Sequence, residues 1–381
     1  MKKTTPPKAD SRLIIATSTG NADLYYATRI FIGDPFVFFQ IGKRKFMVLS
    51  DLEIDRARRV AQADKVLSLS AENARFKKKH GRAPQNLELV EFLLRERGVK
   101  SILVPSTFPV AHADNLRAKK FRVVVCEGSF YPERETKTDA EVRATREALR
   151  ITALGIEAGA EVLRKARIGK GGYLYRNGTK LTSEFVQQTI CSAILWAGGE
   201  TSDPIVAGGV QACDPHERGY GPLRANQAII IDVFPRSKKT GYHGDMTRTV
   251  VRGKASEALK KLYATVHESQ KAAIKKIRAG VSGEDAHNAV KKVFADAGYE
   301  TGNVNGRMQG FFHGTGHGLG LEVHEAPRVC AVKHILKAGH IVTVEPGLYY
   351  PKIGGVRIED VALVTKTGAK ILSSYPYRFE I

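Results

Sequence analysis

The sequence predicts an α+β protein in which a smaller α/β domain precedes a larger one. Short apolar runs alternate with helical stretches through residues 11–130, a long amphipathic pattern begins near residue 139, and strand-like runs dominate after residue 227. We expect the boundary near residue 135, which gives domains at residues 1–135 and 136–381. A chain of 381 residues is long enough for two or three domains with their own cores.

The first domain is predicted to consist of six strands and intervening helices. A helix is expected after Ala83-Pro84, because Leu87, Val90 and Leu94 then fall on one face. This region contains no glycine-rich phosphate loop and no obvious group of catalytic residues. The expected strands cover residues 12–17, 35–42, 45–50, 65–70, 101–106 and 122–128.

The second domain is predicted to begin with a long helix behind a linker at residues 131–135. Thr138 and Glu141 have the spacing of a capping box, and Val142, Leu149, Ile156 and Leu163 recur every seven residues behind it. Further helices are expected at residues 182–197, 256–278 and 283–297. Strands are expected at residues 227–235, 243–251, 339–347 and 356–364.

Composition and charge exclude several classes of protein. Hydrophobic residues make up 43% and charged residues 26% of the chain, which is the balance of an ordinary globular protein rather than a disordered or fibrous one. No apolar run is long enough to span a membrane, and the N-terminus does not have the pattern of a signal peptide. Four cysteines without CxxC spacing argue against a disulfide scaffold, so we expect a cytoplasmic protein.

The net charge of +21 raises the question of nucleic-acid binding. Residues 1–135 contain 25 Lys and Arg against 15 Asp and Glu, an excess of 10, and the rest of the chain supplies the remaining 11. The densest runs, at residues 43–45 and 77–79, lack interleaved aromatic residues on which bases could stack. We therefore expect a solvated basic surface and no specific nucleic-acid partner.

Four carboxylates interrupt apolar strands of the second domain. Asp232 follows the run AIII, and Asp245 begins the next strand after a polar turn, so a β-hairpin can bring the two together. Glu345 interrupts IVTV-E-PG, and Glu359 follows Val356-Arg357-Ile358. A buried carboxylate is costly unless it is paired or bound to a cation. Four of them in one domain indicate a shared cation site, although separate ion pairs would also explain each one.

Three histidines lie in the glycine-rich segment FFHGTGHGLGLEVHE at residues 311–325. His313, His317 and His324 are separated by four and seven residues, and the alternating glycines make a helix unfavourable. The glycines do not form a dinucleotide-binding fingerprint, and His324-Glu325 is not a zincin motif because position 328 is Arg. Three histidines this close together favour a functional site.

The ordered set Asp232, Asp245, His317, Glu345 and Glu359 resembles the metal-dependent aminopeptidase superfamily with the pita-bread fold. Within that superfamily, HGTGHGLGLEVHE, TVEPGLYY and VRIED are similar to the Xaa-Pro peptidases, prolidase and aminopeptidase P. The resemblance covers roughly residues 134–375, and residues 11–130 resemble the N-terminal domain of creatinase and prolidase. It implies a pita-bread catalytic domain preceded by a smaller creatinase-like domain.

The resemblance also implies a dinuclear metal site. Asp232 would chelate one ion, Asp245 and Glu359 would bridge two, and His317 and Glu345 would complete the ligand shell of the second ion. An oxygen-rich set of this kind suits Mn²⁺, with Co²⁺, Zn²⁺ and Fe²⁺ as other candidates.

Five residues take catalytic roles by the same resemblance. His216 would contact the proline side of the substrate, His313 would move a proton or bind substrate, and His324 would stabilise the developing oxyanion. Glu345 would act as general base, and Arg357 would organise the carboxylates or the end of the substrate.

Two features depart from the family pattern. Position 234 is Phe, where family members usually have a glycine two residues after the first aspartate. The hairpin turn also contains about two additional residues within 235–239, which changes the expected rim of the site. His243 shares the strand face of Asp245 by period-two alternation, and we expect it to have a structural or rim role.

The sequence therefore predicts a dinuclear metallopeptidase that cleaves Xaa-Pro bonds in dipeptides or longer peptides. The alternatives are a methionine aminopeptidase or creatinase-like hydrolase of the same fold, and a non-catalytic basic binding protein that reuses it. The presence of all five ligands favours an enzyme. The resemblance further implies short peptide substrates with proline in the second position, a homodimer and no membrane partner.

Overall fold

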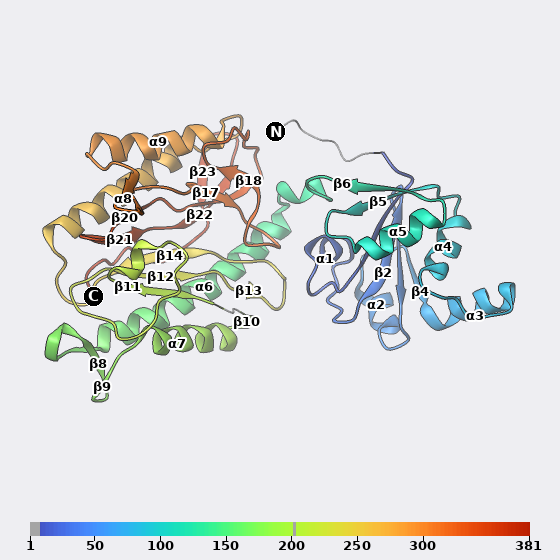
Figure 1. Cartoon of the computed structure of the whole chain (residues 1–381), viewed down its shortest axis with the longest axis horizontal. Coiled ribbons are helices and arrows are strands. Elements are labelled where there is room, and N and C mark those ends of the chain that lie inside the picture. The colour runs from blue at the N-terminus through green and yellow to red at the C-terminus, as the bar shows by residue number, and fades with distance from the viewer. Residues whose placement is uncertain (1–7, 201–202) are drawn as a thin grey trace. The chain divides into compact units, whose positions relative to one another are not determined.

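The chain forms two compact units, and the boundary in the sequence lies between Pro132 and Glu133. The computed structural model describes residues 8–200 and 203–381 (Figure 1). Within these ranges, every helix is too short or too polar to cross a lipid bilayer. A short 3₁₀ helix, η1 (Pro132–Glu135), connects the two units.

The first unit is built on one mixed six-stranded sheet. Strands β1 to β3 pair antiparallel, whereas the pairs β3–β4, β1–β5 and β5–β6 are parallel. Across the sheet, the order is β4 (Lys65–Ser68), β3 (Arg44–Leu49), β2 (Phe36–Ile41), β1 (Ser11–Ala16), β5 (Ser101–Pro105) and β6 (Arg122–Cys126). The expected strand at 65–70 ends early because Ser68 caps the next helix, accepting a hydrogen bond from the N–H of Ala71.

Alternating strand residues divide the apolar side chains of this sheet between two cores. Leu13 and Phe39 belong to one core, and their neighbours Ile14 and Phe38 belong to the other. The first core includes residues of α3 (Leu69–His80), α4 (Glu88–Arg95) and α5 (Val110–Ala118), and the second includes residues of α1 (Ala22–Thr28) and α2 (Ile54–Val60). The unit is therefore a three-layer α/β/α structure.

Four long helices frame the second unit: α6 (Asp139–Lys165), α7 (Ser183–Trp196), α8 (Glu257–Lys276) and α9 (Gly283–Asp296). Helix α6 begins with the expected capping box, in which Thr138 and Glu141 bond to each other's backbone N–H groups. Gly155 of α6 allows close packing on α7, because a Cβ there would lie 2.9 Å from Ile194. The only tryptophan of the chain, Trp196, ends α7 and is 90% exposed.

Two sheets lie between the helix pairs of the second unit. Helices α6 and α7 share a core with the sheet β11 (Ile205–Gly208), β12 (Ile229–Val233) and β14 (Met246–Val250). Helices α8 and α9 lie on the other side, over a sheet whose order is β18 (Glu325–Val329), β17 (Gly316–Gly318), β19 (Ile341–Val344), β22 (Asp360–Val364) and β23 (Ala369–Ile371) (Figure 1).

Smaller elements complete the second unit. They are η2 (Lys170–Gly172), η3 (Gln211–Cys213), the sheet β7 (Arg167–Ile168), β8 (Leu174–Arg176) and β9 (Thr179–Lys180), and the pairs β10 (Gly199–Glu200) with β13 (Arg236–Ser237), β15 (Gly302–Val304) with β16 (Arg307–Gln309), and β20 (Gly347–Tyr350) with β21 (Gly354–Arg357).

One predicted strand, at residues 356–364, is wrong as a single element. Arg357 ends β21 opposite Gly347, whereas Asp360 begins β22 opposite Val344. Between them, the N–H of Glu359 donates to the carbonyl of Thr247 in β14. The chain changes pairing partners at Glu359, and this places Glu359 beside β14, the strand that follows Asp245.

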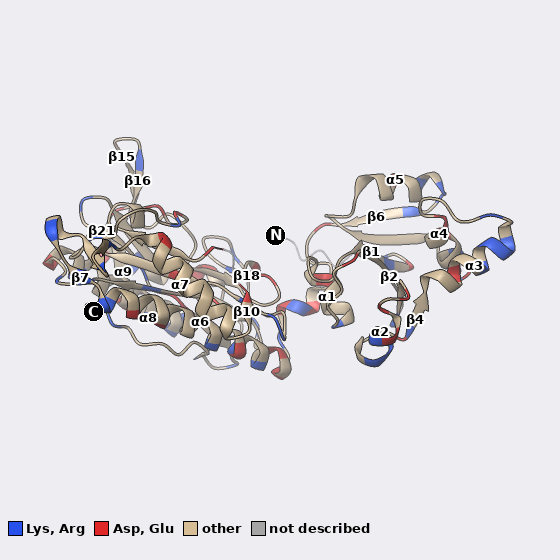
Figure 2. Ribbon diagram, turned by 90° about the horizontal axis from the view of Figure 1, so that it is seen from below, with Lys and Arg blue, Asp and Glu red and all other residues tan. Residues whose placement is uncertain are grey.

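Lys and Arg are found on elements of both units, with Asp and Glu interspersed among them (Figure 2).

Candidate metal centre

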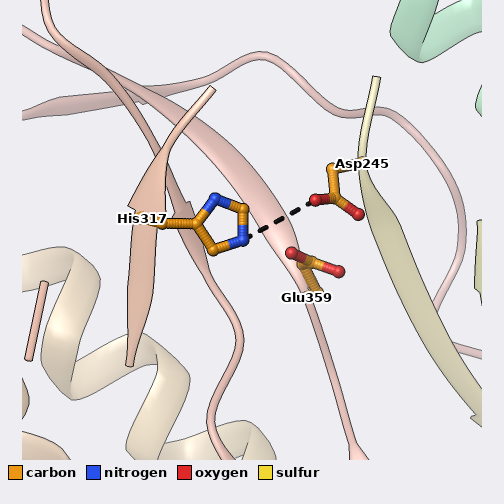
Figure 3. A group of neighbouring side chains, drawn as sticks. All are labelled: Asp245, His317 and Glu359. Atoms are coloured by element: carbon orange, nitrogen blue, oxygen red, sulfur yellow. Dashed lines mark ion pairs between the residues drawn. The ribbon is translucent and has the colours of Figure 1, made fainter. Parts of the chain in front are cut away.

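Two carboxyl groups and one imidazole converge in the second unit: His317 lies in β17, Asp245 directly precedes β14 and Glu359 directly precedes β22 (Figure 3). Ligand atoms of Asp245, His317 and Glu359 all lie within 4.8 Å of one another, and all three residues are buried. The Nε2 atom of His317 lies 3.8 Å from Oδ2 of Asp245 and 3.1 Å from Oε1 of Glu345. The structure therefore brings four of the five expected ligands into one group.

Asp232, the fifth expected ligand, comes from the strand beside Asp245. Its Oδ2 accepts a 2.8 Å hydrogen bond from Arg357, whereas its buried Oδ1 has no hydrogen-bond partner. A buried carboxylate oxygen without a partner is costly, and a bound cation would satisfy it. Oδ2 of Asp232 is thus occupied by Arg357, and Oδ1 is left to contact a metal ion.

The electrostatics of the group also fit a cation. Burial and the negative charge of Asp232 raise the pKa of Asp245 well above its usual range. Burial and the charge of Asp245 do the same to the pKa of Glu359. Both shifts express the cost of holding several carboxylates together in a dry environment, and divalent cations would offset that cost.

His317 and Glu345 form an ion pair within this group. Burial opposes a charge on His317, but the hydrogen bond and charge of Glu345 raise the pKa of His317 to about 9. Burial likewise opposes the charge of Glu345, yet the hydrogen bond from His317 lowers its pKa to about 2. Both shifts show that the site favours a positive charge beside the Glu345 carboxylate.

The glycines around His317 are required by close backbone packing. A Cβ at Gly316 would lie 2.0 Å from the carbonyl oxygen of Thr343, and a Cβ at Gly318 would lie 2.2 Å from that of Ala326. Strand β17 thus fits between its neighbours only without side chains on either side of His317. The alternating glycines that argue against a helix also allow this buried strand.

His313 belongs to a hydrogen-bonded chain beside the carboxylates. Its Nε2 lies 2.9 Å from the hydroxyl of Tyr349, and Arg357 donates to the same hydroxyl at 3.1 Å and to Asp232 at 2.8 Å. Burial lowers the pKa of His313 to about 4, so its ring is neutral near pH 7. Tyr349 is fully buried, and burial raises its pKa to about 12.

The other two histidines lie at the edge of the group. The ring of His324 packs edge-on against the ring of His317, with 4.3 Å between the ring centroids. His216 is exposed in the loop that follows η3. Burial lowers the pKa of both His313 and His324, and the charge of His216 lowers each further. His216 therefore lies near enough to interact electrostatically with the rings of His313 and His324.

A second buried network lies behind the carboxylates. Arg248 donates to the carboxylate of Asp360 at 2.9 Å and to the carbonyl of Glu359 at 2.6 Å. Asp360 also accepts hydrogen bonds from Gln270, Ser373 and Tyr377. This network fastens β14 to the segment that carries Glu359.

Sequence reasoning assigned no role to three residues of this region. Tyr349 links His313 to Arg357, Thr247 donates to Glu359 at 2.8 Å, and Thr343 donates to Glu345 at 3.3 Å. Thr343 precedes Glu345 by two residues and Thr247 follows Asp245 by two. Period-two alternation from each carboxylate is the signal that identifies both threonines.

Comparison with known proteins agrees with this geometry. A model of metallopeptidase family M24 matches residues 143–366. An Xaa-Pro dipeptidase from Pyrococcus horikoshii is 29% identical over 289 residues, which cover 74% of this chain and 76% of that protein.

Two solved structures match over nearly the whole chain. The Xaa-Pro dipeptidase from Bacillus anthracis has a TM-score of 0.81 at 25% identity, covering 98% of this chain and 95% of that one. The X-Pro aminopeptidase from Thermotoga maritima has a TM-score of 0.81 at 21% identity, covering 98% of both chains, and shows the shared fold. The chain belongs to metallopeptidase family M24, and its second unit has the pita-bread fold.

Proposed function

We propose that this protein hydrolyses the bond between an N-terminal residue and a following proline, using two divalent ions. The observation that carries the proposal is the convergence of four carboxylates and one imidazole, in which the buried Oδ1 of Asp232 has no hydrogen-bond partner. The dipeptidase and aminopeptidase names of similar proteins support the Xaa-Pro bond as the target.

In this proposal, five residues hold the ions. Asp232, Asp245 and Glu359 would supply carboxylate oxygens, and His317 and Glu345 would complete the set with an imidazole nitrogen and a further carboxylate. When bound, the ions would polarise the scissile carbonyl and make a water more acidic. We propose Mn²⁺ as the preferred metal, because four carboxylates and a single imidazole make an oxygen-rich site.

One ligand and one neighbouring histidine would supply the proton transfer and the hydrogen bond that the reaction needs. Glu345, 3.1 Å from His317, would accept a proton from the attacking water as the general base. His324, whose ring packs edge-on against that of His317, would donate to the carbonyl oxygen as that atom gains charge.

The chain His313–Tyr349–Arg357 takes the proline end of the substrate. Arg357 is buried and held by Tyr349 and Asp232, so it positions both the aspartate and the ring of His313. His216, exposed at the edge of the same region, would contact the proline residue from the solvent side.

Further properties follow from the same resemblance. We propose that the first unit is an N-terminal domain of the creatinase and prolidase type, since both solved structures match 98% of this chain. We also propose a cytoplasmic homodimer that acts on short peptides and has no specific nucleic-acid partner. Similar structures carry both dipeptidase and aminopeptidase names, so the length of the peptide is left to experiment.

The test is hydrolysis by protein reconstituted with Mn²⁺. Ala-Pro, a longer Ala-Pro peptide, Ala-Ala and Met-Ala are compared by kcat/KM. We expect the two proline substrates to be cleaved much faster than the others. Equal rates for Ala-Ala or Met-Ala would instead indicate a broader aminopeptidase, and no hydrolysis by fully loaded protein would indicate a binding protein.

A further inference from the structure

The hairpin that carries Asp232 and Asp245 continues beyond them without a change of register. Asp232 is opposite Thr247 and Val233 is opposite Met246. Further along, Gly244 donates to the carbonyl of Pro235 at 2.9 Å, and Arg236 forms a bridge with His243. Each pair steps by one residue on both arms, so Phe234 lies directly opposite Asp245.

Opposed residues of an antiparallel pair share one face of the sheet, as do residues two apart on one strand. Phe234 therefore shares the face of both Asp232 and Asp245, and His243 shares it with Asp245. Phe234 and His243 are both only partly buried. Phe234 is also the residue that replaces the glycine expected from the family pattern. We call Phe234 and His243 together the tip pair.

The strands define an axis through the site. Along β14, Thr249 accepts a hydrogen bond from the N–H of Arg357, and Thr247 donates to the carboxylate of Glu359. Asp245 follows in the same direction, and His243 comes last. The backbone of Arg357 thus lies beside Thr249, and its guanidinium donates to Asp232, which is opposite Thr247. Arg357 therefore reaches the carboxylates from the end of β14 away from the tip pair.

The tip of the hairpin is firmly held. Strand β13 pairs with β10, and Arg236 forms an ion pair with Glu200. The hydroxyl of Tyr242 donates to Glu141 at 2.6 Å, and the N–H of His243 donates to the carbonyl of Gly320 at 2.8 Å. A wall built on paired strands can hold its shape when a substrate binds.

We propose that the tip pair forms the wall of the subsite for the substrate's N-terminal side chain and favours apolar residues there. The inference rests on the proposed function, in which the proline lies at the Arg357 end and the scissile carbonyl lies at the carboxylates. The N-terminal residue then extends toward Phe234. An apolar N-terminal side chain gains binding free energy by burying its surface against the aromatic ring of Phe234, whereas an N-terminal glycine has no side chain to bury there.

The test compares Leu-Pro with Gly-Pro as substrates of the Mn²⁺-loaded protein. We expect wild type to prefer Leu-Pro in kcat/KM, and Phe234→Ala to lower the Leu-Pro to Gly-Pro ratio by about tenfold, a typical size for losing an apolar contact in a pocket. Phe234→Leu, which keeps an apolar side chain, should retain most of the preference. His243→Ala should lower the ratio in the same direction.

Controls separate this inference from the function on which it rests. Lys238→Ala changes an exposed residue in the turn of the same hairpin and should leave the ratio unaltered. Metal content should be equal in wild type and Phe234→Ala, because Phe234 supplies no ligand. Failure of loaded wild type to cleave either dipeptide overturns the proposed function. If wild type cleaves both dipeptides and Phe234→Ala has an unchanged or increased Leu-Pro to Gly-Pro ratio of kcat/KM, the proposed function stands and the role of the tip pair is refuted.

Discussion

Replacing Asp360 by Asn should destabilise the second unit strongly, although the two side chains have nearly the same size and shape. Each oxygen of the Asp360 carboxylate accepts two hydrogen bonds, from Arg248 and Ser373 on Oδ1 and from Gln270 and Tyr377 on Oδ2. An amide nitrogen accepts none, so two of the four donors lose their acceptor. Arg248, whose side chain is only 3% exposed, also loses its counter-ion.

The expected loss is about 3–5 kcal/mol of unfolding free energy, the usual cost of removing one partner of a buried ion pair. Asp214→Asn provides a matched control, because Asp214 pairs with Arg307 at 2.7 Å but is 61% exposed. Exposed pairs contribute about 0–1 kcal/mol, so this variant should resemble wild type.

The measurement is pulse proteolysis in urea, which follows the folded fraction of residues 133–381 even if the two units unfold separately. A chelator is present throughout, because bound metal would add its own stabilisation. If Asp360→Asn costs no more than Asp214→Asn, the buried network does not hold this unit together as its geometry implies.

The remaining predictions concern the metal centre. Chelation should abolish peptidase activity and added Mn²⁺ or Co²⁺ should restore it; full activity in metal-free protein, checked by elemental analysis, would contradict the metal proposal. Asp245→Ala and Glu359→Ala should each lose more bound metal than Asp232→Ala, because each would remove a ligand from both ions; equal losses would argue against bridging. His317→Ala should lower metal content, whereas His324→Ala should keep the metal and lower kcat by on the order of 10²–10³. Metal lost from His324→Ala but retained by His317→Ala would reverse these two roles.

The sequence predicts the main elements of the second unit because their signals are local. Thr138 and Glu141 mark the start of α6, since a capping box involves only neighbouring residues. Asp232 and Glu345 attract attention because a charge within an apolar strand is costly and calls for a partner. These observations required no knowledge of which strands are neighbours.

Features that depend on distant partners were not predictable in the same way. The run around Glu359 has one continuous apolar pattern, and nothing in it reveals that Arg357 pairs with β20 while Asp360 pairs with β19. Tyr349 resembles an ordinary buried strand residue until its hydroxyl is seen between His313 and Arg357. Pairing and hydrogen bonding over long sequence separations determine such roles, and periodicity records neither.

The exposed position of Trp196 determines what optical spectroscopy can measure on this protein. A hydrated indole at the end of α7 already emits as it would in an unfolded chain, so its fluorescence is a poor monitor of denaturation. The same exposure makes it a sensitive reporter of anything that covers this end of the helix. A shift to shorter emission wavelength with rising protein concentration, together with protection from a soluble quencher, would reveal self-association through that surface without any added label.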